Sequence, residues 1–136
     1  MRVVKSDRLP IASEQDILVA RQAVRRLAQE LSFSLVDQTK IVTATSELAR
    51  NTVIYGGGGT MLAEVVAEDS RQGVRLTFAD EGPGIPDLEL AMKDGWTSGS
   101  GLGMGLSGTK RLVNDFAIDT KPGAGTRVTI AKWKHV

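Results

Sequence analysis

Hydrophobic side chains recur at helical spacing in two neighbouring stretches near the start of the chain. The first begins at Ser13, a residue type that caps helices, and continues with apolar residues three or four positions apart up to Leu31. Ser34 repeats this start signal, and the second stretch runs to about Tyr55, where the glycine run 56–59 ends it. We therefore expect two consecutive amphipathic helices.

The remainder of the chain alternates between strand-like and glycine-rich segments. Residues 2–9 are expected to form an edge strand that ends at Pro10, because proline cannot donate to a central ladder. The other expected segments are strands at 61–68, 74–79, 117–121 and 126–134, a turn at 70–73, loops at 80–86 and 95–103, a short helix at 87–94 and a third amphipathic helix at 106–116. Helices before and after a block of antiparallel strands predict a two-layer α/β sandwich, in a single domain over residues 1–136.

Composition narrows the classes of function. The chain has 17 basic and 16 acidic residues, so it lacks the broad positive surface that nucleic-acid binding requires. It has no cysteine, which excludes disulfides and thiolate metal sites. No apolar run approaches the roughly 20 residues of a membrane span, and no secretory signal pattern opens the sequence. We expect a cytoplasmic protein with no nucleic-acid or membrane partner.

Glu47 and Asn51 are four residues apart on the second expected helix and therefore share one face of it. They border its apolar stripe, at the edge of the buried face. Asn51 offers a neutral oxygen of the kind that Mg²⁺ binds, and Glu47 can orient or deprotonate a nucleophile. Taken alone, the pair would also suit a solvated flank of the helix.

Asp80 directly follows a strand-like run and opens the sequence DEGPG. A carboxylate at a strand end can accept a hydrogen bond from an exocyclic amine such as that of adenine. Gly82 and Gly84 would let the backbone approach the base closely. Taken alone, the same segment would also suit an ordinary turn.

A glycine-rich stretch at 99–105 leads into the third expected helix. Such approaches bind phosphates through the free backbone N–H groups of the helix start. Residues 103–108 also match the dinucleotide pattern GxGxxG, but the segment before them is not strand-like, so the required strand-turn-helix context is missing. The glycines at 123 and 125 indicate a hairpin turn before the last strand.

The order of these four segments resembles the GHKL ATPase family over nearly the whole chain. The resemblance implies the Bergerat fold, in which helices cover one face of a mixed, mostly antiparallel sheet and ATP lies under a lid, here very short at about 95–100. Position by position, it implies that Asn51 holds Mg²⁺, that Asp80 binds the adenine amine and that Thr126 supports Asp80. The residues it implies for ATP binding are Asn51, Asp80, Gly82, Gly84, Gly101, Leu102, Gly103, Met104, Gly105 and Thr126.

Within that family, the chain is most similar to the small serine kinases of bacterial partner-switching systems. The similarity is carried by VDQTKIVTATSELARNT (36–52), YGGGG (55–59), FADEGPGIPD (78–87), GLGMGLSGTKRLVNDF (101–116) and GAGTRVTIAKWK (123–134). It implies phosphorylation of a serine or threonine on STAS-domain proteins, including stressosome scaffolds, with Glu47 as the catalytic base. It also implies that the released kinase binds and activates a PP2C-type phosphatase.

Two other functions compete with the kinase hypothesis. Anti-sigma factors share every one of these segments, so the ATP site does not separate an anti-sigma binding module from a kinase. A NAD-binding domain would rest on the GxGxxG match alone.

Overall fold

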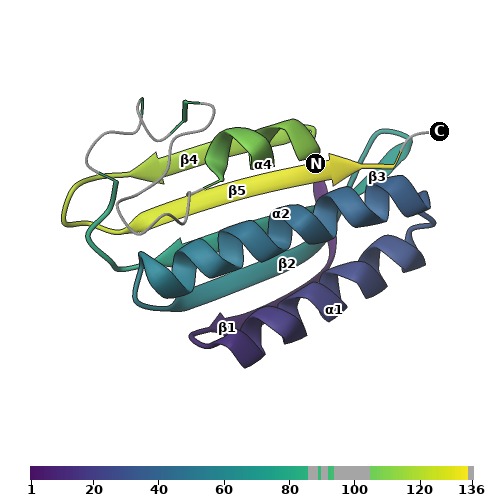
Figure 1. Ribbon diagram of the computed structural model, residues 1–136. Coiled ribbons are helices and arrows are strands. Elements are labelled where there is room, and N and C mark those ends of the chain that lie inside the picture. Colours follow the sequence, from purple (N-terminus) through teal and green to yellow (C-terminus); the bar gives the residue numbers. More distant parts are fainter. Residues whose placement is uncertain (86–88, 90–91, 94–104, 135–136) are drawn as a thin grey trace.

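The protein is described here from a computed structural model, which covers residues 1–85, 89, 92–93 and 105–134. Its strands form one sheet in the order β1-β2-β3-β5-β4 (Figure 1). They are β1 (Arg2–Ile11), β2 (Gly59–Glu68), β3 (Arg71–Asp80), β4 (Asp115–Thr120) and β5 (Thr126–Trp133).

All strand pairs in the described part of the chain are antiparallel, so the expectation of a mixed sheet is corrected. The reason lies in the connection between β1 and β2. The two intervening helices run out and back, so that β2 starts opposite the end of β1, with Gly59 paired to Ile11. A neighbour that starts where the previous strand ended must run in the opposite direction.

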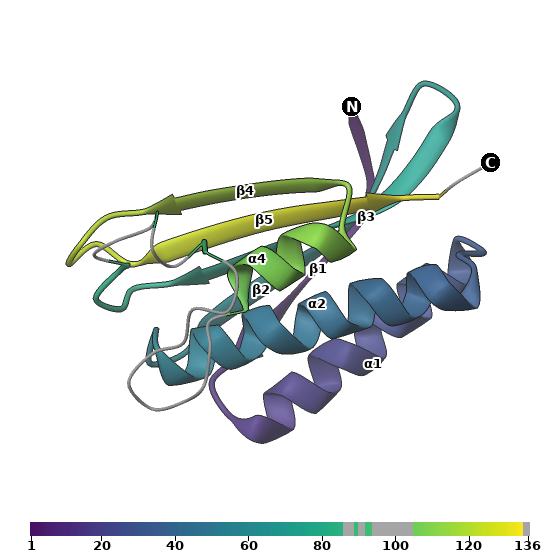
Figure 2. The ribbon, with the colours of Figure 1, turned by 45° about the horizontal axis from the view of Figure 1, so that its top comes forward.

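Three helices in the described residues cover one face of this sheet (Figure 2). They are α1 (Glu14–Glu30), α2 (Leu35–Ile54) and α4 (Leu106–Leu112). The two predicted start signals are confirmed: Ser13 Oγ accepts the N–H of Asp16 at 3.2 Å, and Ser34 Oγ accepts the N–H of Asp37 at 3.1 Å. The predicted two-layer sandwich with helices on one face is also confirmed.

The core lies between the helices and the inner face of the sheet. It is built from fully or nearly fully buried side chains of α1, α2, α4 and the four strands β1, β2, β3 and β5. Its members include Ile11, Ile17, Val24, Ile41, Leu48, Met61, Leu76, Phe78, Leu106 and Ile130. The core therefore fixes α2 and α4 against β3 and β5, the elements on which the predicted site residues lie.

Several element boundaries differ from the sequence prediction. Strand β1 runs through Pro10 to Ile11 instead of ending there, β2 and β4 each begin two residues earlier than expected, and β3 is longer at both ends. The turn between β2 and β3 lies at Asp69 and Ser70 rather than at 70–73, because Asp69 adopts a left-handed conformation with φ 54° and lets Glu68 pair directly with Arg71. Helix α4 ends at Leu112, and the N–H of Asn114 already donates to Ala131 O in β5 at 3.0 Å. The segments expected as a short helix at 87–94 and as a lid at 95–100 lie largely outside the described residues.

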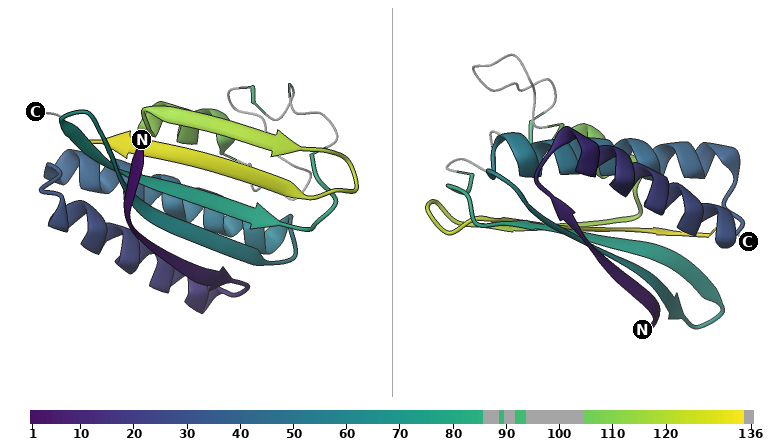
Figure 3. Two further views of the ribbon diagram at one scale, coloured as in Figure 1. Left: turned by 180° about the vertical axis from the view of Figure 1, so that it is seen from behind. Right: turned by 90° about the horizontal axis from the view of Figure 1, so that it is seen from below.

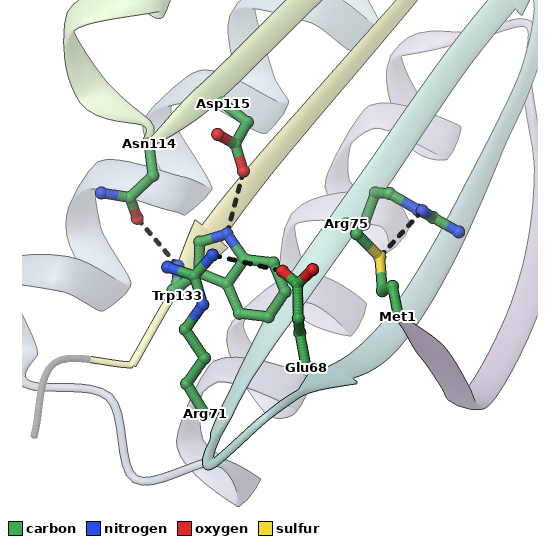
Figure 4. Close-up of polar contacts among 7 residues, drawn as sticks. All are labelled: Met1, Glu68, Arg71, Arg75, Asn114, Asp115 and Trp133. Atoms are coloured by element: carbon green, nitrogen blue, oxygen red, sulfur yellow. Dashed lines mark hydrogen bonds and ion pairs between the residues drawn. The ribbon is translucent and has the colours of Figure 1, made fainter.

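The opposite face of the sheet is not covered by any described helix (Figure 3). At one end of that face Trp133 donates from Nε1 to Asp115 Oδ2 at 2.9 Å, and the guanidinium of Arg71 lies 3.9 Å from the centre of its ring (Figure 4). These contacts bury Trp133 on a sheet face that would otherwise expose it.

Farther along, Arg75 binds Glu64 through two hydrogen bonds, at 2.9 and 3.2 Å. These bonds raise the pKa of the Arg75 guanidinium, since they stabilise its charged form. The ion pair is part of the sheet surface and lies away from the predicted site residues. No helix within the described ranges is both long and apolar enough to cross a membrane.

Candidate functional site

A pocket opens between α2, the ends of β3 and β5, and the start of α4. Four of the residues predicted to bind ATP line it together: Asn51, Asp80, Gly84 and Thr126. The other lining residues are Leu48, Thr52, Tyr55, Gly56, Phe78, Ile85, Leu106 and Val128. The pocket thus has an apolar wall with a few polar groups at its rim, the composition expected of a small-molecule site.

Asp80 is the last residue of β3 and pairs with Thr126, the first residue of β5. Its Oδ1 accepts the N–H of Gly82 at 2.9 Å, which turns the chain immediately after the strand. On its other side, Gly56 lies so close that any side chain there would collide with the Asp80 carboxylate. The carboxylate is therefore held in one orientation at the pocket wall.

Thr120, which the sequence analysis did not identify, forms hydrogen bonds with two residues that line the pocket, Ile85 and Thr126. Its Oγ1 accepts the N–H of Ile85 at 2.9 Å and lies 3.1 Å from the carbonyl of Gly125 and 2.9 Å from Thr126 Oγ1. These contacts tie the loop after β3 to the hairpin between β4 and β5. A signal was available, since Thr120 and Thr126 directly flank the turn segment KPGAG (121–125).

Glu47 lies beside the pocket rather than in its wall. It is one turn before Asn51 on α2, and its carboxylate contacts the backbone at the start of α4. A Cβ atom at Gly105 would lie 2.6 Å from Glu47 Oε2, and Gly105 caps α4 in the left-handed conformation with φ 64°. The predicted base and the end of the predicted phosphate-binding segment are therefore in direct contact.

The remaining predicted residues divide into two groups. Gly82 supports the site through its bond to Asp80 but does not line the pocket. Gly101, Leu102, Gly103 and Met104 lie outside the described residues, so their role in binding phosphate stays a prediction. Tyr55 was not predicted, although it follows Asn51 by one helical turn and lines the same pocket.

The polar side chains of the pocket suit a magnesium ion that is held mainly by waters and substrate phosphates. Within the described ranges, no three residues of the types His, Cys, Asp or Glu are grouped as a protein-only metal cage would need. Mg²⁺ does not require such a cage, since it keeps several waters and binds through one or two protein oxygens plus substrate phosphates. Asn51 lines the pocket, and an amide oxygen is a ligand type of this kind.

A family model matches most of the chain. Residues 36–135 match the family described as histidine kinase-, DNA gyrase B-, and HSP90-like ATPase. The chain belongs to this GHKL family.

Two curated relatives span nearly its whole length. It is 46% identical over 123 residues to "Serine/threonine-protein kinase RsbT" of Bacillus subtilis (strain 168). The aligned region covers 90% of this chain and 92% of that protein. It is 34% identical over 128 residues to "Anti-sigma F factor" of Bacillus licheniformis. The aligned region covers 89% of this chain and 86% of that protein.

Two solved structures share the fold. The RsbU and RsbW domains of Rv1364c from Mycobacterium tuberculosis align over 98% of this chain and 34% of that chain, with a TM-score of 0.66 and 21% identity. The catalytic domain of the histidine kinase ThkA aligns over 98% and 97%, with a TM-score of 0.55 and 15% identity. At these identities the alignments establish the fold alone, and that fold is the one expected of a GHKL domain.

Proposed function

We propose that this chain is a serine/threonine-protein kinase of a bacterial partner-switching module, which uses Mg-ATP to phosphorylate STAS-domain proteins. One observation carries the proposal. The carboxylate of Glu47 lies against Gly105 at the start of α4, one helical turn from Asn51 and next to the pocket that Asp80 lines. The side chains proposed as base, magnesium ligand and adenine acceptor therefore lie in or beside one pocket.

Each of these groups has a defined part in the reaction. Asp80 accepts a hydrogen bond from the adenine amine and so selects the nucleotide. Gly105 and the segment before it contact the phosphates through their backbone, at the start of α4. Asn51 would hold Mg²⁺, and the ion would neutralise charge on the phosphates. Thr126 supports Asp80 through their pairing across β3 and β5.

Glu47 acts on the acceptor hydroxyl. The hydroxyl oxygen forms a bond to the γ-phosphorus of ATP while its proton moves to the Glu47 carboxylate. The bond between the γ-phosphorus and the bridging oxygen breaks, and its electron pair stays on ADP. A base positioned in this way contributes about 10²–10⁴-fold to the rate.

A second candidate function is that of an anti-sigma factor, in which bound nucleotide tunes the affinity for a sigma factor. The sequence favours the kinase, since identity to the kinase relative is 46% and identity to the anti-sigma relative is 34% over similar lengths. We further propose that residues 1–136 act as one domain in the cytoplasm. In its released state the kinase would bind and activate a PP2C-type phosphatase.

Phosphate transfer tests the proposal directly. The chain is incubated with radiolabelled ATP and magnesium, together with a STAS-domain protein from the same genome, and in parallel with a sigma factor. Label on a serine or threonine of the STAS-domain protein supports the kinase. Stable, ATP-dependent capture of the sigma factor without any transfer supports the anti-sigma alternative instead.

A further inference from the structure

We infer that Arg50 is a further catalytic residue, whose guanidinium moves onto the transferring phosphoryl group during the reaction. The inference rests on the proposed kinase function and assigns a role to a side chain that the site described so far does not use.

Arg50 lies on the outer side of the site. At about 100° per residue, Asn51, Glu47 and Arg50 follow one another around α2, away from its buried stripe. Asn51 lines the pocket, Glu47 contacts the start of α4, and Arg50 stands next to Glu47, with Nη1 4.0 Å from Oε1. An acceptor hydroxyl that binds the Glu47 carboxylate would therefore lie near the guanidinium.

The contact between Arg50 and Glu47 leaves the guanidinium able to move. The two side chains are 40% and 38% exposed, and 4.0 Å is the outer limit of an ion pair. Exposed pairs between residues three or four apart on a helix stabilise it by only about 0.3–0.5 kcal/mol. A phosphate group, with its higher charge and a geometry that matches the planar fork of arginine, competes easily for such a side chain.

The pocket itself lacks a positive side chain. Among the described residues that line it, none is a lysine or an arginine. Lys110 and Arg111 lie in the last turn of α4, at the end away from Gly105. Phosphoryl transfer mainly requires that negative charge on the equatorial oxygens of the transferring group be stabilised. Among the described residues, Arg50 is a cation that lies beside the proposed base.

In this arrangement Arg50 changes partners once per reaction. In the resting enzyme it pairs weakly with Glu47. When ATP and the acceptor are bound, it binds an oxygen of the γ-phosphoryl group, which also releases Glu47 to take the acceptor proton. The same bonds form and break as in the proposed reaction, and Arg50 itself gains and loses only hydrogen bonds.

Single-turnover phosphate transfer from ATP to a STAS-domain protein tests the role, alongside an ATP titration of each variant. Arg50→Met keeps an unbranched stem and a similar helix propensity but removes the charged group, and Arg50→Lys keeps the charge without the planar fork. Arg26→Met is the matched control, because Arg26 is an exposed arginine on α1. We expect Arg50→Met to slow transfer by about 10²-fold or more while ATP affinity stays within about threefold, and Arg50→Lys to recover at least about tenfold.

Three outcomes would overturn the inference. Transfer by Arg50→Met within about threefold of the wild type would leave Arg50 with only a weak helix-surface pair. Parallel losses of ATP affinity and transfer would make it a ground-state ligand rather than a catalytic residue. If the wild-type chain transfers no phosphate, the proposed kinase function fails first, and the inference fails with it.

Discussion

The backbone of Gly105 packs directly against the carboxylate of Glu47, so that a single methyl group at position 105 would lie 2.6 Å from Oε2. Gly105 also has φ 64°, a conformation that costs other residues about 1–2 kcal/mol. A side chain at position 105 would therefore require the proposed base on α2 or the start of α4 to move.

We predict that Gly105→Ala lowers the rate of phosphate transfer by about tenfold to a hundredfold, because it displaces either Glu47 or the start of α4. Gly108→Ala is the matched control, since a Cβ there meets nothing within 4 Å. The control should keep its activity and gain about 0.5–1 kcal/mol of stability, as alanine usually does in a helix. Equal transfer rates for the two variants would contradict the described contact.

Much of the fold and part of the candidate site could be predicted from local sequence. Ser13 and Ser34 mark helix starts through bonds to residues three positions away, and such bonds depend on nothing distant. Asp80 at a strand end and Asn51 at the edge of a helix stripe were identified for the same reason, since each position follows from the period of its own element.

The features that the sequence analysis missed depend on contacts between segments far apart in the chain. Thr120 bonds to Ile85, 35 residues away, and no periodicity encodes that contact. The length of α4 was overestimated because its end is set by the bond from Asn114 to β5 and not by its own residues. The sheet was expected to be mixed because the resemblance was applied as a whole, whereas the pairing of Ile11 with Gly59 sets the direction of β2.

Asp80→Asn should weaken ATP binding by about tenfold to a hundredfold without unfolding the protein. The amide keeps an oxygen for the N–H of Gly82, but it can turn its NH₂ group toward the base and lose the acceptor. Loss of a hydrogen bond to a charged group costs about 1.5–3 kcal/mol. Calorimetric titration with ATP measures the change, with Asp119→Asn on β4 as the exposed control. Near wild-type affinity in a folded Asp80→Asn variant would remove Asp80 from the nucleotide site.

Asn51→Ala should abolish the effect of magnesium on nucleotide affinity. Asn51 lines the pocket and provides the protein oxygen proposed for the ion. ATP affinity is measured for the wild type and the variant, each with magnesium and with EDTA. The wild type should bind more tightly with magnesium, and the variant should bind equally in both buffers. A variant that responds to magnesium as the wild type does would show that another group holds the ion.

Lys132→Met should destabilise the fold by about 1.5–3 kcal/mol. The lysine is 4% exposed, donates to Leu112 O at the end of α4 at 3.1 Å and lies 3.6 Å from Asp37 Oδ1 in the first turn of α2. The substitution leaves both acceptors without their buried cation. Lys5→Met breaks the exposed pair with Glu30 and should cost at most about 1 kcal/mol. Urea unfolding compares the two, and equal losses of stability would contradict the role assigned to the buried pair.

The most direct test of the central claim is the transfer rate of Glu47→Gln, measured as phosphate incorporation into a STAS-domain protein beside an ATP titration of the same preparation. The substitution keeps the volume and helix propensity of the side chain and removes its capacity to accept a proton. With Asn51 in place, we expect near-normal affinity for Mg-ATP and transfer slower by about 10²–10⁴-fold. Transfer within about threefold of the wild-type rate, the result expected of an ordinary residue on a helix flank, would contradict the account.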